Sequence, residues 1–78
     1  MDLQQFVKQY KNQSEAAAVL GLSQGMVSGR LTGRYPMTAD VALDLEKRSG
    51  GVMTRYALFP EGFGKPPQGY VNHESIAV

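Results

Sequence analysis

Two arginine side chains in the middle of the chain have the chemistry to bind an anionic partner. Arg30 and Arg34 are the only charged residues between Leu20 and Thr38, and both are basic. A basic window without acids could face the phosphate backbone of a nucleic acid, because guanidinium groups bind phosphate oxygens well. Chance placement explains the same window equally well, so the elements that would position these side chains must be considered.

The chain offers little for catalysis or metal binding. It has no cysteine, and its one histidine, His73, has only Glu74 beside it near the end of the chain. The sequence presents no recognisable pair of nucleophile and base. We therefore expect no enzymatic activity, no metal site and no other cofactor.

Length and composition predict a single small soluble domain. The chain has 78 residues, of which 42% are hydrophobic, and a formal net charge of +1. A domain of this size has a thin hydrophobic core and a small margin of stability. The sequence begins with neither a signal peptide nor an apolar run long enough to span a membrane. With the absence of cysteine, this favours the reducing cytoplasm.

Hydrophobic spacing and capping residues predict four helices, the first starting after Asp2 and ending near Tyr10 or Lys11. The predicted N-caps of the next three are Asn12 (with Glu15 in a capping box, or Ser14 as the alternative), Ser23 and Thr38. The predicted stops are Gly21, Gly33 and Gly50-Gly51. Lys47 and Arg48 are expected to interact with the dipole of their own helix. The side chains expected inside are Leu3, Phe6, Val7, Tyr10, Leu20, Leu22, Met26, Val27, Leu31, Val41, Ala42 and Leu45.

The last third of the chain is less defined. Residues 52–59 form a short apolar segment, which could be a fifth helix or a strand, and Pro60 ends it. Residues 61–78 are rich in glycine and proline, and we expect a flexible tail there. The predicted organisation is an all-α domain of four to five helices over residues 1–60, followed by a flexible tail over residues 61–78.

Residues 13–32 have the pattern of two short helices that cross at a steep angle. Ala17 is small where the second helix would pass over the first, and Gly21 follows where the turn needs a residue without a Cβ. The aliphatic side chains that could lock the two helices together are Leu20, Leu22, Val27 and Leu31. This is the arrangement of a helix-turn-helix, whose second helix enters the major groove of DNA by its N-terminal end.

The same segment resembles the helix-turn-helix of lambdoid-phage Cro repressors, and the run from Ala16 to Phe63 is similar to the YdaS-type Cro-like regulators of prophages. The residues that carry the resemblance are Ala17-Ala18, Leu20-Gly21, Ser23-Gln24, Val27-Ser28, Pro36, Gly50-Gly51, Thr54-Arg55, Leu58 and Pro60. The resemblance implies a lambda-repressor-like fold. It also implies a sequence-specific transcriptional repressor that binds a pseudo-palindromic operator as a dimer, with half-sites about 34 Å apart.

Carried over by position, the resemblance implies base-edge contacts from Gln24 and Ser28, with Thr32 as a further candidate. The chemistry agrees, because a glutamine amide can bond bidentately to adenine and a serine hydroxyl can bond to any base edge. The complete set of residues expected at double-stranded DNA is Gln13, Ser14, Ser23, Gln24, Gly25, Ser28, Gly29, Arg30, Thr32 and Arg34.

Two glycines depart from the usual pattern of such regulators. Gly25 and Gly29 would lie on the side that meets DNA, where longer polar side chains are usual. They either allow close approach of the helix backbone to the bases or leave base reading sparse. Arg30 and Arg34 would contact the DNA backbone, although an arginine that reaches the groove can also read guanine. Backbone N–H groups at Gln13 and Ser14 would contact phosphate as well.

A dimer surface is expected beyond the fourth helix, because the segment there is more apolar than a monomer should expose. Its residues are Met53, Tyr56, Leu58, Phe59 and Phe63. Two alternatives to a repressor stay open. The YdaS-type resemblance also implies an antitoxin, whose tail over residues 61–78 would bind a toxin or another neighbouring-gene protein. The chain could also be a helical bundle that keeps the motif only as a scaffold.

Overall fold

The computed structural model describes residues 1–70, which form six helices and no strand. The helices are α1 (Leu3–Lys8), α2 (Gln13–Leu20), α3 (Gln24–Thr32), α4 (Ala39–Arg48), α5 (Arg55–Leu58) and α6 (Pro60–Phe63). The predicted all-helical class is confirmed for this part of the chain. Residues 71–78, which include His73 and Glu74, lie outside the described residues, so the tail predicted for 61–78 is described only in part.

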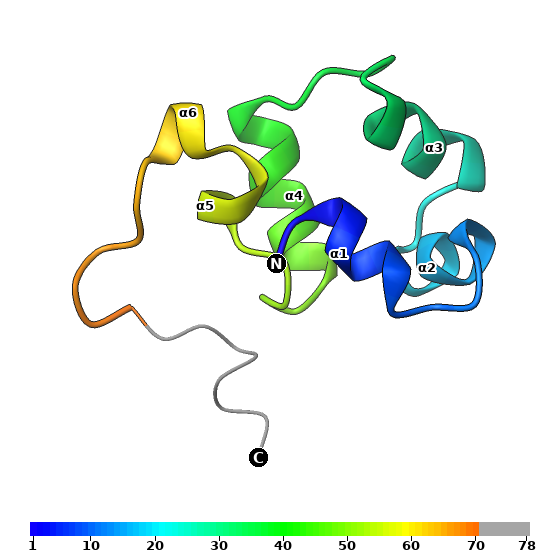
Figure 1. The fold of residues 1–78 in the computed structure, drawn as a ribbon, viewed down its shortest axis with the longest axis horizontal. Helices are drawn as coiled ribbons and strands as arrows, with labels where there is room; N and C mark the ends of the chain where they lie inside the picture. Colours follow the sequence, from blue (N-terminus) through cyan, green and yellow to red (C-terminus); the bar gives the residue numbers. More distant parts are fainter. Residues whose placement is uncertain (71–78) are drawn as a thin grey trace.

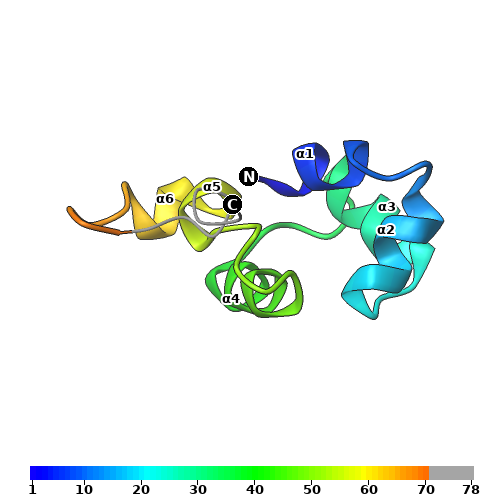
Figure 2. The same ribbon diagram turned by 90° about the horizontal axis from the view of Figure 1, so that it is seen from below.

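The helices form a flat body with principal extents of 36 × 30 × 16 Å. Figure 1 shows α2 and α3 together at one end, α5 and α6 at the other, and α1 and α4 between them. In the turned view of Figure 2, α1 and α4 lie on opposite sides of the body. The terminal amine of Met1 donates to the carbonyl of Val52 at 3.3 Å, which joins the start of the chain to the loop after α4.

The helix starts follow from local side-chain chemistry. Asn12, Ser23 and Thr38 are N-caps, as predicted, and each side-chain oxygen accepts a hydrogen bond from the N–H three residues later, at 2.9, 3.1 and 3.3 Å. Asn12 is therefore the cap of α2, and the alternative cap, Ser14, is not used.

The first helix is shorter than its hydrophobic spacing predicts. It ends at Lys8 instead of Tyr10 or Lys11, and Asp2 and Gln5 close a capping box at its start. The carboxylate of Glu15 accepts from the N–H of Lys11 at 2.9 Å. The reciprocal bond of the capping box expected at α2 is thus made one residue before the cap.

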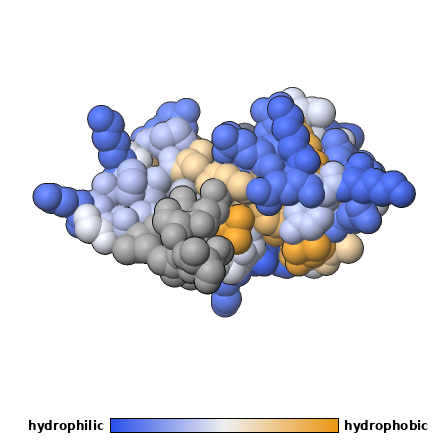
Figure 3. All heavy atoms as spheres, turned by 60° about the horizontal axis from the view of Figure 1, so that its bottom comes forward, coloured by the Kyte–Doolittle hydropathy of each residue, from blue (hydrophilic) through white to orange (hydrophobic). Residues whose placement is uncertain are grey.

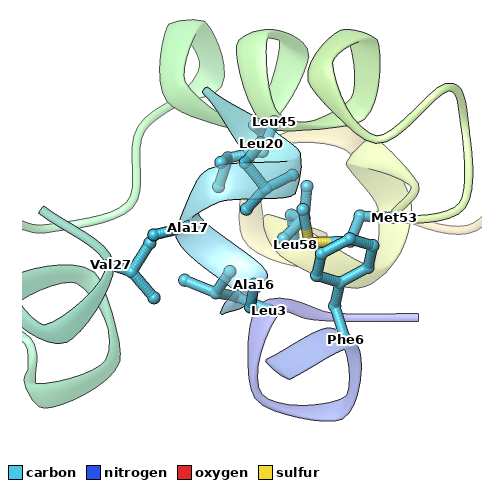
Figure 4. Packing of buried hydrophobic residues seen from close by; sticks show 10 residues of the cluster. Leu3, Phe6, Ala16, Ala17, Leu20, Val27, Leu45, Met53 and Leu58 are labelled. Atoms are coloured by element: carbon cyan, nitrogen blue, oxygen red, sulfur yellow. The ribbon is translucent and has the colours of Figure 1, made fainter. Parts of the chain in front are cut away.

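Ten buried side chains from five of the helices and the loop before α5 form the core, and Figure 4 shows their packing around α2. They are Leu3, Phe6, Ala16, Ala17, Leu20, Val27, Ala42, Leu45, Met53 and Leu58. Most of the other predicted core residues are partly buried against this cluster: Val7, Tyr10, Leu22, Leu31 and Val41. Met26, also expected inside, is only half-buried and lies outside the cluster.

The segment left open by the sequence is helical. Thr54 caps α5, and its buried hydroxyl accepts from the N–H of Ala57 at 3.2 Å. Arg55 holds the carboxylate of Glu46 on α4, with its Nη2 2.7 Å from Oε1, and this hydrogen bond raises the pKa of Arg55. α6 continues past the predicted domain boundary at residue 60, and Phe63 packs against the core.

Candidate nucleic-acid interface

A three-residue turn joins α2 to α3, and its geometry depends on Gly21. This residue has φ 72° and ψ 29°, the left-handed conformation that glycine adopts without a Cβ penalty. The N–H of Leu22 then donates to the carbonyl of Ala17 at 2.9 Å, which satisfies a carbonyl at the end of α2. The turn ends at Ser23, the cap of α3, so the two helices follow each other directly.

The α2–α3 pair is closely packed. Ala17 is 1% exposed and Val27 is fully buried, and Figure 4 shows their side chains adjacent between the two helices. A side chain larger than a methyl group at residue 17 would hold the helices apart, as the sequence predicts. Leu20 is buried beside them, and Leu31 packs partly buried against the same cluster.

Arg48 on α4 supports the turn from outside the pair. Its Nη1 donates to the carbonyl of Leu20 at 3.1 Å, and its Nε lies 2.7 Å from the carboxylate of Asp44. The arginine therefore satisfies a carbonyl at the C-terminal end of α2, whereas the sequence predicts only an interaction with the dipole of its own helix. Sequence reasoning missed this contact because the two residues are 28 positions apart.

The first residues of α2 and α3 are joined by a hydrogen bond between side chains. The Nε2 of Gln24 donates to the Oε1 of Gln13 at 2.8 Å. The sequence predicts both residues at DNA, but nothing in it indicates that they touch. The bond fixes the rotation of both amides, and it leaves the Oε1 and one N–H of Gln24 and both N–H groups of Gln13 for other partners.

The neighbouring residues expected at DNA have less unused hydrogen-bonding capacity in their side chains. Ser23, Gly25 and Thr32 are exposed and Ser28 is half-buried. The hydroxyl of Ser23 accepts from the N–H of Met26, and the hydroxyl of Thr32 donates to the carbonyl of Gly29 at 3.3 Å. Gln24 is therefore the exposed side chain on α3 with the most unused hydrogen-bonding capacity.

Structural context separates the two glycines of α3. A Cβ added at Gly25 would meet no atom within 4 Å, so this residue opens onto free space. Gly29 is buried, and a Cβ there would lie 2.3 Å from the ring of Tyr35. The expectation that Gly29 faces DNA is therefore wrong, because Tyr35 covers it; Gly25 lies on the open side.

The predicted backbone contacts lie around the pair. Arg34 is exposed and Arg30 half-buried, both at the C-terminal end of α3, while Ser14 is exposed and Gln13 half-buried at the start of α2. Beside Gln13, the side chains of α1 border an open hollow of about 370 Å³, which Gln13 and Leu31 also line. Lys8 of α1 also lines this hollow.

The expected dimer residues divide into two groups. Met53 is fully buried and Leu58 is 8% exposed, so both belong to the protomer core, and the expectation that they face a partner is wrong. Tyr56, Phe59 and Phe63 are half-buried and pack edge to face, with the ring of Phe63 6.4 Å from that of Tyr56 and 6.2 Å from that of Phe59.

The exposed large hydrophobic side chains come from separate parts of the described chain. Among residues 1–70 they are Val19, Tyr35, Leu43 and Tyr70. Figure 3 shows one face, on which hydrophobic areas are small and separated by hydrophilic residues. Tyr70 packs on Tyr56 with ring centroids 5.1 Å apart, and desolvation raises the pKa of Tyr70.

Metal-binding groups and membrane-spanning helices are not found in the described part of the chain. Residues 1–70 contain no group of three or more His, Cys, Asp or Glu side chains that could hold a metal ion. No helix among them is long and apolar enough to cross a membrane. Comparisons of the chain with protein-family models, with curated proteins and with solved structures find no match.

Proposed function

We propose that this protein is a sequence-specific DNA-binding transcriptional repressor in which α2 and α3 act as a helix-turn-helix. In this proposal the N-terminal end of α3 enters the major groove, and Gln24 reads a base edge with the Oε1 and N–H that Gln13 leaves free. The resemblance of residues 13–32 to Cro-type regulators supports the same role.

The single observation that carries the proposal is the 2.8 Å hydrogen bond between Gln13 and Gln24. An exposed glutamine amide free to rotate loses side-chain entropy when it binds a base. Here a neighbouring amide holds the group in one orientation at an exposed helix N-terminus, before any ligand is present. Such preorganisation favours bidentate recognition of adenine, whose N6 and N7 require one donor and one acceptor side by side.

Charge around the pair supports binding to the DNA backbone. No acidic residue lies between Glu15 and Asp40, and this stretch includes all of α3. Arg30 lies on α3 and Arg34 lies just beyond its end, so phosphate contacts and base contacts can form together. The formal net charge of +1 is small, and affinity therefore depends on where these cations lie more than on their number.

Dimerisation belongs to the same proposal. One short helix makes few base contacts, and two linked copies on a pseudo-palindromic operator would gain affinity through their high effective concentration. Because Met53 and Leu58 belong to the protomer core, the candidates for contact between protomers are the half-buried aromatic rings of Tyr56, Phe59 and Phe63.

The test begins with selection of preferred duplexes from a random double-stranded DNA library, followed by fluorescence anisotropy on the selected and a scrambled duplex. We expect Gln24→Ala to weaken binding to the selected duplex by about 1–3 kcal/mol and to relax its preference. Arg34→Ala should weaken binding to both duplexes to the same extent and make the affinity less dependent on salt concentration.

The matched control is Gln9→Ala, which removes an exposed glutamine side chain at the end of α1. It should leave affinity, preference and salt dependence at parent level. The proposal fails if the parent chain selects no duplex, or if Gln24→Ala and Arg34→Ala both keep parent affinity.

A further inference from the structure

Tyr35 folds back over α3 and lies directly against the helix backbone. Its N–H donates to the carbonyl of Gly29 at 3.1 Å, and its ring atoms Cδ2 and Cε2 lie 2.3 and 2.4 Å from the position that a Cβ of Gly29 would occupy. No residue other than glycine leaves room for the ring at this position. Glycine at 29 and tyrosine at 35 therefore form one structural unit.

Two guanidinium groups lie against the same ring. The Cζ of Arg30 is 5.7 Å and the Cζ of Arg34 is 5.8 Å from the ring centroid of Tyr35, within the range of a cation–π interaction. Arg30 is also held by the backbone, because its Nη1 donates to the carbonyl of Pro36 at 3.3 Å. We refer to Arg30, Arg34 and Tyr35 as the arginine–tyrosine cluster.

No acidic side chain of the described residues pairs with the cluster. Among residues 1–70, neither Arg30 nor Arg34 forms a salt bridge, whereas Arg48 and Arg55 are paired with Asp44 and Glu46. Two like charges beside one ring repel each other, and the ring offsets only part of that repulsion. An anion with several oxygen atoms would remove it and would use the donors that remain on both guanidinium groups.

The position of the cluster indicates which anion it fits. Gln24 opens α3 and the cluster closes it; nine residues of α-helix separate the two ends by about 12 Å. The major groove is about 12 Å wide. With the N-terminal end of α3 in the groove, the helix is therefore long enough for its C-terminal end to reach a phosphate strand that borders the groove.

We infer that Tyr35 is a positioning residue that holds Arg30 and Arg34 as a clamp for phosphates of duplex DNA, and that Gly29 is glycine to seat its ring. The inference rests on the proposed function and adds to it the residue that preorganises the backbone contacts. The clamp reads no sequence, so it supplies affinity and fixes the register in which Gln24 meets the bases.

The experiment compares Tyr35→Leu, Tyr35→Phe and Gly29→Ala with the parent chain by fluorescence anisotropy on the selected and scrambled duplexes over a range of salt concentrations. Tyr35→Leu removes the ring and keeps both charges. It should bind both duplexes about 5- to 30-fold more weakly, with an unchanged preference between them. The slope of log affinity against log salt should become shallower by about 0.9 for each phosphate that the variant no longer neutralises.

Tyr35→Phe keeps the ring and should behave as the parent chain, whereas Gly29→Ala displaces the ring and should behave as Tyr35→Leu. Circular dichroism of each variant verifies that the fold is intact. The clamp is overturned if Tyr35→Leu keeps parent affinity and salt slope while Gln24→Ala still relaxes the preference; the proposed function would then stand. If the parent chain binds no duplex DNA, the proposed function and the clamp are both overturned.

Discussion

Gly25 and Gly29 are one helical turn apart on α3, and their surroundings differ completely. Replacement of a helical glycine by alanine stabilises a helix by about 1 kcal/mol when the new methyl group has room. At Gly25 the methyl group meets nothing, while at Gly29 it meets the ring of Tyr35. The same substitution at the two positions therefore separates helix propensity from the packing of one ring.

Gly25→Ala is expected to raise the free energy of unfolding by about 1 kcal/mol. Gly29→Ala has the same gain in propensity but forces Tyr35 away from both arginines, so its free energy of unfolding should be no higher than that of the parent chain. Urea unfolding followed by circular dichroism measures both. Equal stabilisation by the two substitutions would contradict the packing of Tyr35 on Gly29.

The hydrogen bond between Gln13 and Gln24 should contribute to binding of the preferred duplex. Gln13→Ala removes the acceptor that orients the amide of Gln24, so it should weaken binding to the preferred duplex by about 1 kcal/mol. In the background of Gln24→Ala the same change should have a smaller effect, with a coupling energy of at least about 0.5 kcal/mol.

Ser14→Ala is the matched control for this cycle. Ser14 is exposed beside Gln13 on α2, and its substitution leaves the backbone N–H in place. Its effect should be small and should add to that of Gln24→Ala without coupling. Strict additivity for Gln13 and Gln24 would mean that the hydrogen bond has no part in DNA recognition.

At the scale of the elements, local interactions make the helices predictable. Caps at Asn12, Ser23 and Thr38 and the left-handed Gly21 and Gly33 act on neighbours within a few residues, and the sequence displays them directly. The predicted α1 is too long because its apolar spacing continues to Tyr10, which packs on Phe6 from outside the helix with ring centroids 5.1 Å apart.

The candidate site is predictable as a set of residues and not as a set of contacts. The small Ala17, the turn residue Gly21 and the aliphatic Val27 indicate a helix pair, because steric fit limits which side chains can lie at these positions. Contacts between separate elements depend on the final packing, which spacing along the chain does not encode. The ring of Tyr35 over Gly29 and the reach of Arg48 to α2 are of this kind.

Arg48 provides the prediction at this scale. Arg48→Ala removes the donor to the carbonyl of Leu20 and should lower the free energy of unfolding by about 1 kcal/mol, since that carbonyl then loses this hydrogen bond. Lys47→Ala is the control, because Lys47 is also exposed in the last turn of α4. Its effect should be within about 0.5 kcal/mol. Chemical denaturation measures both, and an equal loss for the two variants would show that only charge at the end of α4 matters.

For the whole molecule, the thin core limits how many large apolar side chains are available for contact with a partner. The apolar segment around Met53 and Leu58 predicts that both lie on a dimer surface. In the folded protomer they complete the core next to Phe6 and Leu45, as Figure 4 shows. A small domain needs most of its large apolar side chains for its own stability. Any dimer contact must therefore use side chains that the core leaves exposed or half-buried.

Met53→Ala tests this assignment. Met53 is fully buried in the core, so its truncation to alanine should lower the free energy of unfolding by about 2–5 kcal/mol. The near-isosteric Met53→Leu should lower it by less than about 1.5 kcal/mol and leave the protein folded. Met26→Ala, at a half-buried methionine outside the core cluster, is the control and should lose about 1 kcal/mol or less. Sedimentation equilibrium of Met53→Leu and the parent chain without denaturant gives the deciding measurement. If Met53 packs within the protomer, the association constant between protomers stays at the parent value; an association weakened by Met53→Leu would place Met53 between subunits instead.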